Sequence, residues 1–270
     1  MSLIDIGANL ASDSFHHDLD EVLARAWDAG LDQIVVTGSS RESALQAVEL
    51  ARRYPSKLYA TAGLHPHHAS DWTPALGELF RELAQRPEVV SLGECGLDYF
   101  RDLSPREDQR HAFIAQLAIA AELNKPLFLH QRDAHADFLA ILREWRPRLS
   151  NVVVHCFTDT RAAMNDYLAL DCHIGITGWI CDERRGAHLI EAVCDIPDDR
   201  LLIETDAPYL LPRTAPKQAS RRNEPAFLSW VVKALAAARG QHEDEVARLS
   251  SANATTFFGL NHQPYTVAKK

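Results

Sequence analysis

Four side chains of metal-binding types follow short apolar runs in this sequence, and together they could hold one divalent cation. They are two carboxylates and two imidazoles: Glu94, Asp206, His130 and His155. A mixed set of oxygen and nitrogen donors suits a borderline or hard ion such as zinc, manganese or magnesium. Each side chain also has a purely structural explanation, since a histidine that ends a strand is commonly a packed core residue. The metal site is therefore predicted only if the fold brings the four together.

The elements that must position these residues alternate between short apolar strands and amphipathic helices. The expected strands span residues 3–6, 33–37, 58–62, 89–92, 126–129, 152–154, 172–176 and 201–203. The expected helices span residues 18–29, 41–54, 74–85, 105–123, 133–145, 160–169, 184–194, 227–239 and 243–258, with Ser104 as the N-cap of the fourth. Eight strand–helix units predict an α/β fold, a (β/α)8 TIM barrel. A doubly wound parallel sheet is the alternative.

A barrel would bring the predicted metal-binding residues together, because its active site lies at the carboxyl ends of the strands. Asn9 follows the first expected strand and His65 the third, so both belong beside the predicted site. Tandem histidines are expected to be solvated loop residues rather than ligands: His16, His17, His67 and His68. Alternation along a strand turns Cys95 and Cys156 away from the site, where they would be packed thiols.

A basic stretch follows Asp206. Up to Glu224 its only charged residues are four cations: Arg213, Lys217, Arg221 and Arg222. Beside a metal site, such a stretch could clamp a phosphate; a solvated proline-rich loop is the alternative. Trp179 lies on the same rim of a barrel and could stack on a base.

Composition sets the outer limits of the interpretation. The chain has 270 residues, 46% of them hydrophobic and 24% charged, which is typical of a folded protein. A net charge of −9 excludes a uniformly basic surface that wraps long duplex DNA. No apolar run is long enough for a membrane helix, and the N-terminus does not resemble a signal peptide. The odd number of cysteines, five, predicts reduced thiols in the cytoplasm. We expect one domain over 1–260, a frayed tail at 261–270, and a monomer.

Four motifs resemble those of the TatD family of metal-dependent deoxyribonucleases. They are residues 63–67 (GLHPH), 93–98 (GECGLD), 151–157 (NVVVHCF) and 202–210 (LIETDAPYL). The resemblance runs from Asp5 to about Leu260. Residues 175–186 and 220–225 are similar to TatD-like members in particular.

The resemblance implies a distorted, amidohydrolase-like TIM barrel that hydrolyses phosphodiester bonds. For TatD-like members it implies a magnesium-dependent 3′→5′ exonuclease acting on single-stranded DNA and RNA, with a role in the repair of oxidised DNA. By the same resemblance, Glu94, His130 and His155 are metal ligands. Asp206 is a ligand or a catalytic acid–base residue, and His65 is a catalytic-site residue near the phosphate.

One segment departs from the family pattern. Many members open with Asp-x-His-x-His, whereas this chain has Asp5, Gly7 and Asn9 at the matching positions. The loss of two nitrogen donors argues against a zinc pair and favours magnesium or manganese, which prefer oxygen ligands. Two other functions stay open: an amide or ester hydrolase, and a metal- or nucleic-acid-binding barrel without chemistry.

Overall fold

The strands of the barrel follow one another around the sheet in chain order. The computed structural model describes residues 2–217 and 220–260. In this part of the chain the strands are β1 (Leu3–Ala8), β2 (Leu31–Val36), β3 (Leu58–Ala62), β4 (Val89–Asp98), β5 (Leu127–Arg132), β6 (Val152–Val154), β7 (His173–Ile176) and β8 (Leu201–Ile203). Each strand from β1 to β7 pairs in parallel with the next, in the order β1-β2-β3-β4-β5-β6-β7-β8. The predicted TIM barrel is confirmed, because a doubly wound sheet would reverse its strand order at a switch point.

The backbone just beyond β1 and β8 brings the two ends of the sheet together. The amide of Asn9 donates to the carbonyl of Ala207 at 2.7 Å, and that of Asp206 donates to Gly7 at 2.8 Å. The sheet is thereby nearly closed into a barrel, and the closure lies at the end where the predicted site residues are.

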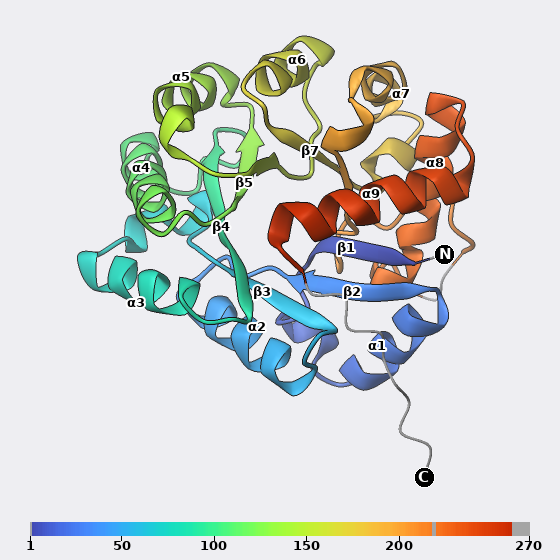
Figure 1. The fold of residues 1–270 in the computed structure, drawn as a ribbon, viewed down its shortest axis with the longest axis horizontal. Coiled ribbons are helices and arrows are strands. Elements are labelled where there is room, and N and C mark those ends of the chain that lie inside the picture. The colour runs from blue at the N-terminus through green and yellow to red at the C-terminus, as the bar shows by residue number, and fades with distance from the viewer. Residues whose placement is uncertain (1, 218–219, 261–270) are drawn as a thin grey trace.

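Helices surround the barrel (Figure 1). They are α1 (Leu19–Asp28), α2 (Arg41–Arg53), α3 (Pro74–Ala84), α4 (Arg106–Leu123), α5 (His135–Trp145), α6 (Arg161–Ala169), α7 (Ala187–Ala192), α8 (Leu228–Arg239) and α9 (Glu243–Phe258). Their buried faces form one core between the helices and the outside of the barrel. A second apolar cluster joins inward side chains, such as Ile4 and Phe128, to Phe257 and Phe258 of α9.

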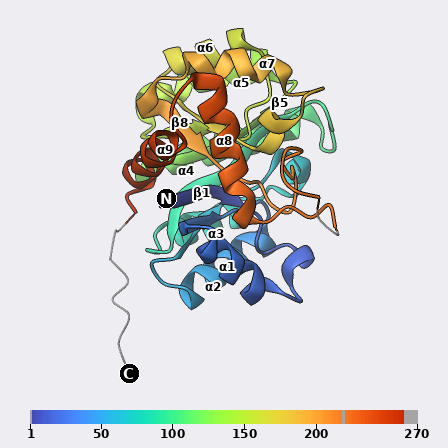
Figure 2. The same cartoon turned by 90° about the vertical axis from the view of Figure 1, so that its right-hand side faces the viewer.

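Helix α9 therefore covers one end of the barrel. Side chains of α9 bind backbone at the start of the strands, as in the bond from Ser251 Oγ to the carbonyl of Ser2 at 2.9 Å. Figure 2 shows α9 on one side of the molecule and the long segment after β8 on the other. The carboxyl ends of the strands are left for the site.

Several boundaries differ from those expected. Strand β4 continues to Asp98 instead of ending at 92, so Glu94 lies within the strand. Ser104 is not an N-cap, because Pro105 takes that position and the Ser104 hydroxyl donates to the carbonyl of His67 at 3.0 Å. Helix α7 is shorter than expected because the amides of residues 184 and 185 bind the carboxylate of Asp182. The predicted tail at 261–270 lies outside the described residues.

Two further predictions from composition can be compared with the structure. Among the described residues, no helix combines the length and the apolar character that a membrane span requires. All five cysteines are free thiols.

Two buried glutamines of α4 fasten the loops that carry site residues. The Gln116 amide accepts from the amide of Leu64 at 2.8 Å and donates to the carbonyl of Leu64 at 3.1 Å. Gln109 likewise accepts from the amide of Asp98 and donates to its carbonyl. The residues next to His65 and at the end of β4 are thus held by α4 through paired hydrogen bonds.

We predict that Gln116→Leu lowers the free energy of unfolding by about 1–3 kcal/mol, because the buried amide and carbonyl of Leu64 lose their partner. Urea unfolding followed by circular dichroism measures the change. The exposed Gln85→Leu is the control and should stay within about 0.5 kcal/mol of the parent. Equal stability of the two variants would contradict this role for Gln116.

Candidate metal centre

A cleft of about 560 Å³ opens at the carboxyl ends of the strands. Most of the predicted site residues line it: Asn9, His65, Glu94, His130, His155, Trp179 and Asp206. They come from strands far apart in the sequence, and the barrel brings them together as the sequence analysis expected of this fold.

The carboxylate of Glu94 is the centre of this group. Three imidazole nitrogens lie around its Oε1: Nε2 of His155 at 2.8 Å, Nδ1 of His130 at 3.1 Å and Nε2 of His65 at 3.3 Å. The Glu94 side chain is 8% exposed, so its charge is largely removed from water. A buried carboxylate is stable only when it is paired or binds a metal.

The donor set fits a divalent metal ion. One donor atom from each of His65, Glu94 and His130 lies within 4.8 Å of the other two. Imidazole and carboxylate donors together suit zinc, manganese or magnesium. That group contains His65, and neither His155 nor Asp206 is part of it; His155 contacts the same carboxylate, and Asp206 lines the same cleft. His65, which the sequence analysis placed near the phosphate, also reaches the position of a ligand.

The electrostatics of the cluster keep the carboxylate ionised. Burial opposes ionisation of Glu94, but the imidazoles of His65 and His155 hold its pKa well below the ordinary value. Burial lowers the pKa of His65 to about 4, so that imidazole is neutral at neutral pH. Its Nδ1 accepts from the amide of His67 at 3.1 Å, which places the ring proton on Nε2, beside Glu94. Burial also raises the pKa of Asp206 to about 8, against the opposing effect of His155. The cluster thus combines a fixed anion with a second carboxyl group that accepts or gives a proton near neutral pH.

Carboxylates and imidazoles alternate across the mouth of the barrel. Glu204 Oε2 lies 3.3 Å from Nδ1 of His155, whose Nε2 contacts Glu94. On the other side of Glu94, Nε2 of His130 lies 3.2 Å from Oδ2 of Asp98. His130 and His155 therefore each have one nitrogen toward Glu94 and the other held by an outer carboxylate. Such outer partners fix the tautomer and orientation of a ligating histidine.

Sequence reasoning missed these outer partners. Asp98 and Glu204 were part of quoted motifs but had no assigned role. His67 was expected to be a solvated loop residue, and that expectation is wrong. Its Nε2 lies 2.8 Å from Oδ2 of Asp98, its ring packs 4.1 Å from that of His65, and it lines the cleft. The sequence does place Asp98 and Glu204 close to the predicted ligands Glu94 and Asp206. Only the folded barrel shows which imidazole each of these two carboxylates contacts.

The residues that depart from the Asp-x-His-x-His pattern have local explanations. A Cβ at Gly7 would overlap Oε2 of Glu204 and lie 2.8 Å from Cζ of Phe128. Asn9 donates through Nδ2 to Oδ1 of Asp206 at 2.9 Å. Glycine leaves room for the buried Glu204 carboxylate, and the amide of Asn9 orients Asp206.

The basic residues after Asp206 divide into two groups. Lys217 and Arg221 line a groove next to the cleft. Arg222 instead forms ion pairs with Asp18 and Glu224, at 2.6 Å and 2.8 Å, and lines neither the cleft nor that groove. Its guanidinium is committed to fastening the loop to α1.

The two cysteines beside predicted ligands also differ. Cys95 is fully buried, as expected. Cys156 lines the cleft instead of facing away from it. Its backbone has φ of 44°, so the strand alternation used for the prediction has already ended there.

The parallel barrel with a histidine–carboxylate cluster at its carboxyl end has the architecture of a metal-binding barrel enzyme. The chain matches the family model described as TatD related DNase over residues 4–259. It therefore belongs to this family of nucleases, as the motifs predicted.

Relatives of known name agree with the family match. The chain is 51% identical to the 3′-5′ ssDNA/RNA exonuclease TatD of Pantoea vagans, over 96% of this chain and 100% of the relative. It is 50% identical to the protein of the same name from Escherichia coli K12, over 96% and 99%. Among solved structures, a TatD homologue from Escherichia coli K12 has a TM-score of 0.87 at 29% identity, covering 96% and 98% of the two chains. A TatD family hydrolase from Entamoeba histolytica has a TM-score of 0.86 at 26% identity, with 96% and 98% covered.

We predict that Glu204→Gln weakens Mn²⁺ binding by about 10–100-fold, because His155 loses the carboxylate that orients its ring. Isothermal titration calorimetry of the purified chain with Mn²⁺ measures the affinity. Asp166→Asn is the matched control, since Asp166 holds Nε2 of His135 at 3.1 Å on the outer helices. The same affinity in parent and Glu204→Gln protein would contradict the orienting role.

Proposed function

We propose that this chain is a metal-dependent 3′→5′ exonuclease that hydrolyses single-stranded DNA and RNA. The observation that carries the proposal is the buried Glu94 carboxylate with three imidazoles around it, open to a cleft, in a member of a nuclease family. The relatives at about half identity bear that activity in their names. A role in DNA repair stays a prediction.

Glu94, His130 and His155 are the proposed metal ligands, with His65 and Asp206 within the same cleft. We propose Mg²⁺ as the ion, with Mn²⁺ and Zn²⁺ as alternatives, because Gly7 and Asn9 supply no imidazole. When bound, such an ion polarises the scissile phosphate and lowers the pKa of water.

The side chains around the metal ligands supply the remaining chemistry. Asp206, fixed by the amide of Asn9, orients the attacking water and accepts its proton at a carboxylate oxygen. Asp206 would be kept ionised for this role by a cation bound beside it, against the effect of burial on its pKa. His65, beside Glu94, is the proposed site residue near the phosphate.

The position of the reacting groups supports a preference for single strands. They line one cleft at the carboxyl ends of the barrel strands, and we propose that a duplex end has to fray before its 3′ end enters this cleft. Unpairing costs a few kcal/mol, and a single strand avoids this cost. Asn9 and Trp179 contact the strand in this proposal, and Lys217 and Arg221 attract its phosphates. We do not extend this role to Arg222, which is held by two carboxylates.

Two expectations about the cellular form of the protein belong to the proposal. We propose that the protein works in the cytoplasm, where its five free cysteines would stay reduced. We also propose that it acts as a monomer.

A 5′-labelled single-stranded oligodeoxynucleotide tests the activity. We expect Mg²⁺ or Mn²⁺ to give a ladder of progressively shorter labelled products, and excess chelator to prevent it. His130→Ala should slow the reaction by more than about 100-fold, because even loss of an outer partner costs 10–100-fold. His135→Ala is the control, since His135 lies on α5 and outside the cleft.

The pattern of products separates the alternatives. Immediate release of labelled mononucleotide would mean attack from the 5′ end, and internal fragments would mean an endonuclease. An intact oligonucleotide with folded protein, in every metal, would overturn the proposal. Cleavage of chromogenic amides or esters would then favour the amidohydrolase alternative, and binding without products would favour a barrel without chemistry.

A further inference from the structure

A second groove, of about 490 Å³, adjoins the catalytic cleft. The two share Trp179 and Leu210, so they are separated only by the wall that these residues form. Four cationic side chains line the second groove: Arg185, Arg213, Lys217 and Arg221. Its one carboxylate, Asp182, is 3% exposed and faces the guanidinium groups of Arg185 and Arg213. The groove is therefore strongly positive, in a chain of net charge −9.

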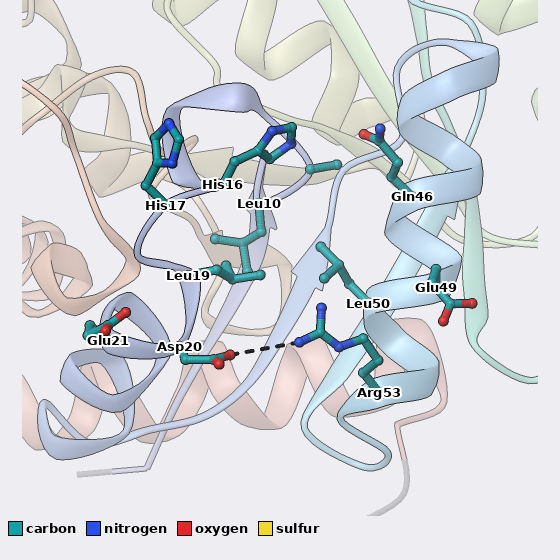
Figure 3. Close-up of a pocket in the computed structure, with 11 residues that line it drawn as sticks. Leu10, His16, His17, Leu19, Asp20, Glu21, Gln46, Glu49, Leu50 and Arg53 are labelled. Carbon is teal, nitrogen blue, oxygen red and sulfur yellow. Dashed lines mark ion pairs between the residues drawn. The ribbon is translucent and has the colours of Figure 1, made fainter.

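Two other grooves on the molecule have the opposite balance. The groove between α1 and α2 (Figure 3) contains one guanidinium, that of Arg53, against three carboxylates: Asp20, Glu21 and Glu49. The groove beside α3 contains Arg41 against Glu42 and Asp71. A polyanionic strand that leaves the cleft is repelled from both and attracted to the groove beyond Trp179.

Backbone contacts fix the shape of one side of this groove, residues 178–186. A Cβ at Gly178 would overlap the carbonyl oxygen of Leu210, and one at Gly186 would overlap that of Trp179. The carboxylate of Asp182 accepts from the amides of residues 184 and 185 and from Nε of Arg185 at 2.8 Å. The segment with Trp179 and Arg185 is thus packed against the segment after β8. This side of the groove is preformed, which lowers the cost of binding a strand.

The wall between the two grooves is an aromatic and guanidinium stack. The Arg185 guanidinium lies 4.3 Å from the Trp179 ring centre, and that of Arg132 lies 5.9 Å from it. Arg132 also lies 3.8 Å from the ring of Phe100, which is 55% exposed. Planar groups of this kind stack on bases whatever their sequence. The wall therefore offers base contacts, and the groove behind it offers phosphate contacts.

We propose that the groove lined by Arg185, Arg213, Lys217 and Arg221 is a binding subsite for the nucleotides upstream of the scissile bond. The 3′-terminal nucleotide lies in the cleft, the strand passes the Trp179 wall, and the preceding phosphates lie in this groove. This inference rests on the proposed exonuclease function. It adds that longer strands bind more tightly than a dinucleotide, because their upstream phosphates reach this groove. The subsite recognises the sugar–phosphate backbone and gives no base specificity.

The dependence of cleavage on strand length tests the subsite. The parent and the variant Arg213→Gln/Lys217→Gln/Arg221→Gln are compared on the dinucleotide dTpT and on (dT)8. We expect kcat/KM of the parent to rise with length, mainly through a lower KM. In the variant, kcat/KM on (dT)8 should fall by about 10–100-fold and on dTpT by much less. The slope of log KM for (dT)8 against log salt should fall by about 2, since each neutralised contact removes about 0.7 for single strands.

A matched control variant loses the same number of positive charges, but at the other end of the barrel. Arg52→Gln/Arg53→Gln/Arg86→Gln removes three cations near the ends of α2 and α3. In this control variant, the ratio of kcat/KM on (dT)8 to kcat/KM on dTpT should equal that of the parent. The slope of log KM for (dT)8 against log salt should also be unchanged. An equal fall on both substrates in the groove variant, or the same loss in the matched variant, would overturn the subsite.

Binding in excess chelator separates the subsite from the exonuclease function. Fluorescence anisotropy with labelled dTpT and (dT)8 gives the affinity of the chain for each strand without turnover. If no oligonucleotide is cleaved, but (dT)8 binds more tightly and only the groove variant loses that gain, the exonuclease proposal fails and the subsite stands. If (dT)8 binds no more tightly than dTpT, the subsite is wrong whether or not the chain is a nuclease.

Discussion

The buried charge of Glu94 is the constraint on which the catalytic end of the barrel depends. A carboxylate removed from water costs several kcal/mol unless partners replace its hydration. Here the partners are imidazoles after β3, on β5 and after β6. Since those strand ends must all reach one oxygen atom, the barrel cannot shift register at this point without exposing or orphaning the charge. The arrangement of three imidazoles around Glu94 therefore serves both the stability of the fold and the binding of a metal ion.

The position of the Glu94 carboxylate also depends on residues that do not contact it. Asp98 and Glu204 hold the far nitrogens of His130 and His155. Gln109 of α4 in turn holds the backbone of Asp98, and Gly7 leaves the space that Glu204 fills. The geometry of the site is therefore held by successive layers of polar groups that each have hydrogen-bond partners. A buried network with missing partners would be less stable than an apolar core.

Much of this could be predicted from the sequence. Apolar runs alternating with amphipathic helices indicated the barrel, and the polar residues after those runs indicated where the cleft would be. Interactions across the barrel could not be predicted, because they join residues far apart in the chain. The extension of β4 to Asp98, the pairing of Arg222 with Asp18, and the turn of Cys156 toward the cleft all depend on such contacts. His67 shows the same limit: two adjacent histidines look solvated until the carboxylate beside them is known.

Helix α9 has a consequence for how the chain is made. Its Phe257 and Phe258 complete the apolar cluster inside the barrel, together with side chains such as Ile4 of the first strand. A ribosome delivers all eight strands before α9, so a barrel that closes during synthesis has an uncovered interior until α9 emerges. Exposed apolar interior of this kind makes a nascent chain prone to aggregate or to need a chaperone. The two ends of the barrel therefore mature at different times: the strand ends that carry the histidines can assemble before the opposite end is sealed.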